Sequence, residues 1–167
     1  HIGFENAIST ENLTVSRSLI AENSPYFLTG GKLGWKANEH WYFSFWVANG
    51  WQLVRGISGN SIPSVGTQAK FSPSERLTLN WSTLIGNNFP DKFRKWRYFS
   101  NQYMTYQFAT NWSLIAGIDL GWEQNEFQSE ALNFWSGGAL ILGYDWDEMW
   151  EASFRIEYYA DPNGVLT

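Results

Sequence analysis

A strict alternation of apolar residues with small or polar ones restricts the fold of this chain more than any other feature. It is clearest from Trp112 to Glu123, where even positions carry Trp, Leu, Ala, Ile, Leu and Trp, and odd positions carry Ser, Ile, Gly, Asp, Gly and Glu. Residues 150–159 repeat it, with an apolar set that begins at Trp150 and ends at Tyr158. Because successive side chains of a β-strand point to opposite faces, the pattern predicts strands with one apolar and one polar face.

Similar segments recur along the whole chain and are separated by connections of two kinds. We expect eight strands and a partial ninth, at residues 26–37, 41–54, 65–71, 76–87, 97–108, 112–123, 132–144 and 150–159, with the partial strand in His1–Ile8. Short connections at 38–40, 72–75, 109–111 and 145–148, rich in turn formers, alternate with longer links at 55–63, 88–96 and 124–131 and a first long link at 9–25. No helix is expected, so the sequence predicts an all-β, antiparallel, up-and-down sheet.

The composition favours a membrane-spanning sheet over a soluble β-sandwich. The chain has 11 Trp, 8 Tyr and 12 Phe, yet its mean hydropathy is only -0.33. Unbroken apolar runs are no longer than Ala139–Leu142, whereas a transmembrane helix needs about 20 apolar residues. A β-strand crosses a bilayer with about 9–11 residues, of which every second one faces lipid. Aromatic residues at both ends of the apolar faces suit the two membrane–water interfaces, so we expect a transmembrane β-barrel.

The connections and the aromatic residues give this barrel a direction. Outer-membrane barrels have short periplasmic turns and longer outer loops, which places the four short connections in the periplasm. We expect an aromatic girdle at each interface, formed by Trp35, Trp41, Phe71, Phe108, Trp112, Tyr144 and Trp150 beside the short connections, and by Trp51, Trp122 and Tyr158 near the opposite strand ends.

The strand number indicates that residues 1–167 are a single domain and a fragment of a larger barrel. The expected count is odd and the last strand runs outward, whereas a single-chain bacterial barrel has an even strand number and ends in the periplasm. The polar face is rich in glycine, at Gly30, Gly34, Gly66, Gly117, Gly121 and Gly137. Glycine fills an interior poorly, which favours a barrel wider than the roughly eight-stranded kind whose side chains fill the interior.

Several short motifs resemble one family of outer-membrane proteins. They are Gly3-Phe4-Glu5-Asn6, Glu11 to Ser18, Ser24 to Gly30, Asn49-Gly50-Trp51, Asn80-Trp81-Ser82, Ile85-Gly86-Asn87 and Glu157 to Gly164. Together they span nearly all of the chain and resemble the OmpL-like β-barrel porins of Bacteroidota. The resemblance implies a pore in the cell outer membrane of a Gram-negative bacterium, built from a chain longer than this one.

A pore acts through its diameter and through the charges that line it. With the apolar parity facing lipid, the lumen receives Lys32, Lys36, Lys70, Asp119, Glu123, Glu151, Arg155 and Glu157. Residues two apart on a strand lie about 6–7 Å apart on the same face, so Arg155 can pair with Glu157 or with a neighbouring strand. These charges either bias the ions that pass or satisfy one another inside the wall.

Two polar segments outside the strands are further candidates for function. The first long link, 9–25, mixes the charged residues Glu11 and Arg17 with apolar residues that can pack on a wall. It is expected to be a constriction loop folded into the pore or, alternatively, an ordinary extracellular loop. Residues 92–97, Lys-Phe-Arg-Lys-Trp-Arg, carry four positive charges. They can contact lipopolysaccharide phosphates or a partner protein, or remain solvated.

Other function classes find little support in the sequence. Histidines occur only at His1 and His40 and cysteine is absent, so no catalytic triad, metal site or cofactor is expected. A net charge of -5 does not favour nucleic acid. We therefore expect a porin, not an enzyme: a passive diffusion channel for ions and small polar solutes. The alternatives are a structural β-barrel subunit of a larger outer-membrane complex and a soluble carbohydrate-binding β-domain. The expected partners are outer-membrane lipid, lipopolysaccharide, other outer-membrane proteins or further copies of the chain.

Overall fold

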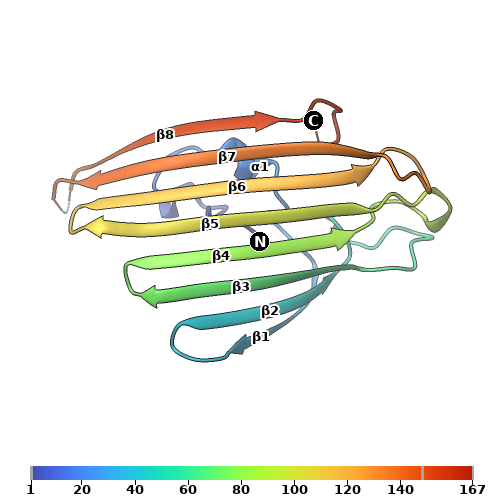
Figure 1. Cartoon of the computed structure of the whole chain (residues 1–167), viewed down its shortest axis with the longest axis horizontal. Helices are drawn as coiled ribbons and strands as arrows, with labels where there is room; N and C mark the ends of the chain where they lie inside the picture. Colours follow the sequence, from blue (N-terminus) through green and yellow to red (C-terminus); the bar gives the residue numbers. More distant parts are fainter. Residues whose placement is uncertain (1, 148, 167) are drawn as a thin grey trace.

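The fold is one antiparallel β-sheet in which each strand pairs with the next along the chain (Figure 1). The computed structural model describes residues 2–147 and 149–166, without the side chain of Ser9. The strands are β1 (Gly30–Lys36), β2 (Trp41–Ala48), β3 (Ser64–Ser74), β4 (Leu77–Gly86), β5 (Arg97–Ala109), β6 (Trp112–Gln124), β7 (Leu132–Asp145) and β8 (Glu151–Ala160). The all-β, antiparallel, up-and-down architecture is thereby confirmed. Within the described ranges β1 and β8 do not pair with each other, so the sheet is open.

The chain before β1 differs from the expectation. Residues 2–8 form no strand, so the predicted partial strand is wrong over its described part, and His1 lies outside the described residues. Two short helices follow, η1 (Ser9–Glu11) and α1 (Leu19–Glu22). The Ser18 hydroxyl caps α1 by accepting a hydrogen bond from the Ala21 N–H at 3.3 Å, which satisfies one of the free donors at a helix start. A helix of four residues is too short to leave a periodic pattern in the sequence.

The longer links also depart from the predicted boundaries. β2 ends at Ala48, so the long link between β2 and β3 covers 49–63 rather than 55–63. Gly50 and Gln52 have φ angles of 148° and 53°, which lie outside the extended region and end the strand. The next link contains a third short helix, η2 (Asp91–Phe93).

Short and long connections lie at opposite ends of the sheet, as their alternation predicts. In Figure 1 the short turns, after β1, β3, β5 and β7, gather on the left, and the longer links gather on the right. We call these the short-turn end and the long-link end. The Asn38 side-chain oxygen accepts hydrogen bonds from the His40 and Trp41 N–H groups, both at 2.9 Å. Such a side chain replaces a backbone partner and so permits a tight turn.

The register gives the sheet two chemically different faces. Trp35, Trp81 and Phe154 are 65%, 56% and 64% exposed and lie on the apolar parity, here called the outer face. The opposite inner face carries the polar parity. Residues 2–25, here called the N-terminal segment, lie against it, and α1 packs on β6, β7 and β8 (Figure 1). Exposed apolar area of this extent marks a surface that contacts lipid or another protein.

The inner face is packed most tightly at the long-link end. A buried apolar cluster there consists of Ile2, Trp46, Trp51, Leu84, Phe99 and Trp135. The ring of Trp51 packs edge-on against Phe99 and Trp135, with centroid distances of 4.9 and 6.0 Å. Trp135 is fully buried, and a Cβ added to Gly121 would come within 2.0 Å of its ring. Gly121 is therefore required for this close approach.

Gly121→Ala is expected to lower the free energy of unfolding by about 1–3 kcal/mol, the usual cost of overpacking a filled core. The added methyl group would displace Trp135, which Trp51 holds in place. Gly31→Ala is the matched control, because no atom lies within 4 Å of the Cβ it would introduce, and its expected change is below about 0.5 kcal/mol. Urea unfolding of the full-length protein in lipid vesicles measures both, and equal stabilities would contradict the packing described here.

Candidate functional site: the inner face of the sheet

The charged residues predicted to line a pore all lie on the inner face. They are Lys32, Lys36, Lys70, Asp119, Glu123, Glu151, Arg155 and Glu157. The structure does not gather them into one group. Those on β6–β8 are mainly acidic, and most of them are engaged by neighbouring residues. Those on β1–β3 are all lysines.

A buried ion pair between Arg97 of β5 and Glu123 of β6 lies at the long-link end of the inner face. The Nη2 and Nε atoms of Arg97 both lie 2.7 Å from Oε2 of Glu123. The two side chains are only 11% and 9% exposed. The Arg97 guanidinium also lies over the rings of Trp51 and Trp135, at 5.1 and 5.7 Å from their centroids. Because the pair is desolvated, Glu123 is held in the wall and does not present a free charge to the interior.

Sequence reasoning placed Arg97 in a basic loop and missed this pair. The alternation of residues 97–108 was the least regular of the expected strands. The register shows that Arg97, Phe99, Asn101 and Tyr103 share the inner face of β5. The sequence signal for the pair was the odd position of Arg97, which places it on the inner face and opposite Glu123 in the antiparallel register of β5 and β6.

Asp119 is also held inside the wall. Its side chain is buried, and Oδ1 accepts a hydrogen bond from the Asn101 side chain at 2.6 Å. Asn101 itself is 1% exposed. A cavity of about 10 Å³ separates this pair from Phe4 and Ile20 of the N-terminal segment. Asp119 therefore contacts the packed interior rather than open solvent.

Arg155 and Glu157 tie the N-terminal segment to β8. Arg155 donates hydrogen bonds to the Thr14 hydroxyl at 2.8 Å, to the Ser16 hydroxyl at 3.0 Å and to the Ser16 carbonyl oxygen. Glu157 lies 3.3 Å from Arg155 and accepts a hydrogen bond from the Leu19 N–H at 2.7 Å. The pair predicted from the spacing on β8 is present, and both partners also bind the segment.

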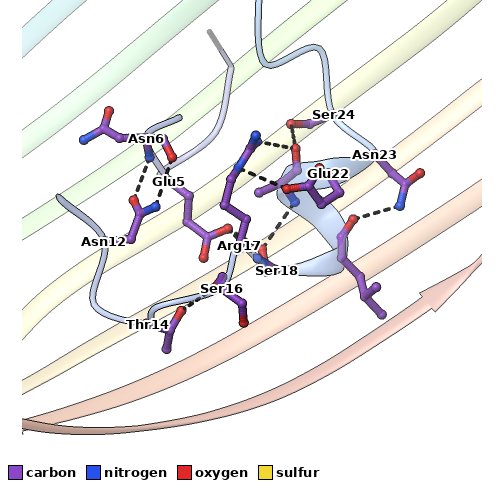
Figure 2. Close-up of polar contacts among 12 residues, drawn as sticks. Glu5, Asn6, Asn12, Thr14, Ser16, Arg17, Ser18, Glu22, Asn23 and Ser24 are labelled. Atoms are coloured by element: carbon purple, nitrogen blue, oxygen red, sulfur yellow. Dashed lines mark hydrogen bonds and ion pairs between the residues drawn. The ribbon is translucent and has the colours of Figure 1, made fainter. Parts of the chain in front are cut away.

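The N-terminal segment holds its own shape through a second set of polar contacts (Figure 2). Oε2 of the buried Glu5 accepts hydrogen bonds from the Ser18 N–H at 2.8 Å and the Ser18 hydroxyl at 2.7 Å. Arg17 donates to the Ala21 carbonyl oxygen at 2.7 Å and lies 3.5 Å from the Glu22 carboxylate. Its guanidinium also covers the Tyr26 ring at 4.8 Å. Arg17 is thus engaged within the segment, whereas Glu11 is exposed.

Two glycines of the inner face leave the space into which side chains of this segment pack. A Cβ at Gly117 would lie 2.5 Å from the Phe4 ring, and one at Gly137 would lie 2.5 Å from Ile20. These glycines, with Gly121 under Trp135, accommodate bulky neighbours. The inference from glycine content to an empty, wide interior is therefore corrected for this part of the sheet, because the space they leave is filled.

The lysines of β1–β3 contrast with these engaged groups. Among the described residues, Lys32, Lys36 and Lys70 form no ion pair. The Lys32 ammonium lies over the rings of Tyr42 and Trp46, at 5.5 and 5.6 Å. Helix α1 of the N-terminal segment contacts β6–β8, whereas Lys32 and Lys36 are exposed, so the inner face around these two lysines is the less covered part.

Most of the predicted girdle aromatics lie on the outer face. At the short-turn end the rings of Trp41 and Phe71 stack at 4.5 Å, and those of Trp112 and Tyr144 lie 4.6 Å apart. The exposed side chains here also include Trp35, Phe108 and Trp150. Trp122 and Tyr158 lie on the outer face nearer the long-link end, where Trp122 packs against Phe134 at 5.4 Å.

The expectation for Trp51 needs correction. Its side chain is 7% exposed and belongs to the inner cluster, so it is not part of an outer girdle. The chain leaves the strand at Ala48, and beyond that point the alternation no longer assigns a face. Asn49 and Gly50, which are turn formers, were the available signal.

The basic loop is partly neutralised by its neighbours. Arg94 lies 2.7 Å from Asp91, and Arg97 belongs to the buried pair described above. Hydrogen bonds from Ser61 and then from Arg94 lower the pKa of the Asp91 carboxyl below its ordinary value of 3.8. Lys92 and Lys95 lie over the Phe93 and Phe89 rings, at 5.0 and 5.5 Å. Two of the four predicted positive charges are therefore compensated within the chain.

The described part of the chain contains no group of three or more His, Cys, Asp or Glu side chains placed to hold a metal ion. Across residues 2–147 and 149–166, no helix has the length and apolar character to cross a membrane.

Comparison with known proteins gives one match. A family model described as "Putative beta-barrel porin-2, OmpL-like" matches residues 1–167. No curated protein and no solved structure matches the chain.

Proposed function

Because the chain belongs to the OmpL-like β-barrel porin family, we propose that it forms part of the wall of a passive diffusion channel in the bacterial outer membrane. Ions and small polar solutes would cross this channel down their gradients, without catalysis, cofactor or energy input. The observation that carries the proposal is the contrast between an exposed apolar outer face and an inner face that keeps uncovered lysines.

The outer face supports contact with lipid. Large apolar side chains are exposed on this face on the edge strands β1 and β8 and on the central strand β4. The exposed fractions are 74% for Leu33, 56% for Trp81, 64% for Phe154 and 60% for Ile156. Stacked aromatic rings at the short-turn end match the headgroup level, where amphipathic rings are favoured. Moving these apolar side chains from water into hydrocarbon is favourable, and this transfer free energy stabilises the protein in the membrane.

The open edges of the sheet support a closed barrel that contains further strands. Each unpaired N–H or C=O group in hydrocarbon costs several kcal/mol, so β1 and β8 need pairing partners within a membrane. A larger circumference also leaves room for water beside the inner face of β1–β3 at the short-turn end, where Lys36 is exposed.

Transport can be measured in proteoliposomes that contain the full-length protein. We expect uncharged sugars to enter and swell the vesicles at rates that fall steeply with sugar size, as diffusion through a water-filled pore requires. A folded protein that admits no sugar and co-purifies with another outer-membrane protein would contradict the proposal. That result would favour the alternative, a structural subunit without a transport role.

A further inference from the structure

The charges of the inner face are unevenly compensated. On β5–β8, Arg97 pairs with Glu123 at 2.7 Å and Arg155 pairs with Glu157 at 3.3 Å, while Asp119 is buried against Asn101. Asp145 of β7 and Glu151 of β8, which pair with each other at the short-turn end, are exposed carboxylates of that region. The three lysines of β1–β3 have no ion pair or hydrogen bond within the described chain. The uncompensated charge on the inner face of β1–β3 is therefore positive, whereas the exposed carboxylates lie on β7 and β8 at the other side of the sheet.

Two of these lysines line a pocket at the short-turn end (left in Figure 1). The pocket has a volume of about 460 Å³ and is lined by Lys36, Lys70, Tyr42, Gln68, Tyr103 and His40, together with neighbouring turn residues. Lys36 pairs with Tyr42 across β1 and β2, and Tyr42 pairs with Lys70 across β2 and β3. Adjacent strands lie about 4.8 Å apart, so the two lysines start roughly 10 Å apart with an aromatic residue between them.

This spacing suits one small ligand held from both sides. Each ammonium group offers three donors on a flexible stem, so both can converge on the same anion. The hydroxyl groups of Tyr42 and Tyr103 add neutral donors. Glu39, in the turn beside the pocket, is the acidic residue of the lining, and it offsets one of the two lysines. His40 is occupied through Nδ1, which lies 3.0 Å from the Ser72 carbonyl oxygen.

We propose that Lys36 and Lys70 form an anion-binding site on the inner wall, for small solutes that carry phosphate or carboxylate groups. The site deepens the proposed channel function and rests on it for its biological role. It concentrates anions at one end of the pore and makes the channel anion-selective, because a charged lining attracts counter-ions. The preference weakens at high salt, where the screening length shortens to a few ångströms.

Ion selectivity tests the site in the full-length protein. With the wild type in a planar bilayer under a KCl gradient, we expect a reversal potential closer to the equilibrium potential of chloride than to that of potassium. Added inorganic phosphate should reduce the chloride current in a saturable manner. Lys36→Gln/Lys70→Gln should lower the chloride-to-potassium permeability ratio by at least about fivefold, because a single unit charge about 4 Å from an ion in water already has that effect and the variant removes two. It should also abolish the phosphate block. Lys92→Gln/Lys95→Gln removes the same charge from a loop at the opposite end and should change neither property.

Calorimetric titration of inorganic phosphate into the detergent-solubilised protein separates the site from the channel. If the wild type binds phosphate and Lys36→Gln/Lys70→Gln does not, the site is supported even when no current flows. The absence of current would then contradict the proposed channel and not the site. An open channel whose wild type prefers potassium, or whose double variant keeps the chloride preference, would overturn the site and leave the channel standing. Circular dichroism of each variant confirms that it is folded.

Discussion

Arg97→Met is expected to lower the free energy of unfolding by about 3–5 kcal/mol, because it leaves Glu123 buried without its counter-charge. The Glu123 side chain is 9% exposed, and both of its contacts with Arg97 are 2.7 Å long. Loss of the guanidinium also removes the cation above Trp51 and Trp135. Urea unfolding of the full-length protein in lipid vesicles, followed by tryptophan fluorescence, gives the difference from the wild type.

Two further variants separate burial from charge in this experiment. Arg94→Met breaks an ion pair of the same length with Asp91, but in a loop where the side chains are 27% and 38% exposed, so its expected cost is below about 1 kcal/mol. Arg97→Met/Glu123→Leu removes both buried charges and should recover much of the lost stability. If Arg97→Met costs no more than Arg94→Met, the pair does not hold the long-link end together.

Arg155→Ala is expected to release the N-terminal segment from β8. Hydrogen bonds to Thr14 and Ser16 are lost together, and each bond to a charged group contributes about 1.5–3 kcal/mol. An opening free energy lower by about 3 kcal/mol corresponds to roughly 100-fold faster hydrogen exchange. We expect this increase at the Ser18 and Leu19 amides, and a larger open-channel conductance because the segment then fills less of the interior.

Glu151→Gln is the control for the segment, because Glu151 lies on the same strand and inner face and is exposed. Its exchange rates should equal those of the wild type. Mass spectrometry of a peptide that covers residues 14–22 follows the exchange, and peptides from β6 report whether the sheet remains folded. Unchanged exchange in Arg155→Ala would mean that Glu5 and packing on Gly117 and Gly137 are enough to hold the segment.

The strands and their faces were predictable because their signal is local. An alternation with period two specifies both the element and the side of each residue, so Lys32 and Glu157 were assigned to the same face from sequence. The short turns were predictable for the same reason, since Asn38 acts within three residues of its own position.

The N-terminal segment was less predictable because its contacts join distant positions. Glu5 reaches Ser18 over 13 positions, and Leu19 reaches Glu157 over 138. Nothing near Glu5 indicates that it is buried, and Arg17 looks like a free charge until its contacts with Ala21 and Glu22 are known. The division of the inner face into compensated and uncompensated charges likewise depends on these long-range pairs.

Single-channel recording of the full-length protein in a planar lipid bilayer tests the central claim most directly. A water-filled pore predicts steady, stepwise currents that rise in proportion to the salt concentration of the bath and persist at low voltage. A protein that is folded in the bilayer, as judged by circular dichroism, and passes no steady current would contradict the claim that this sheet is part of the wall of a diffusion channel.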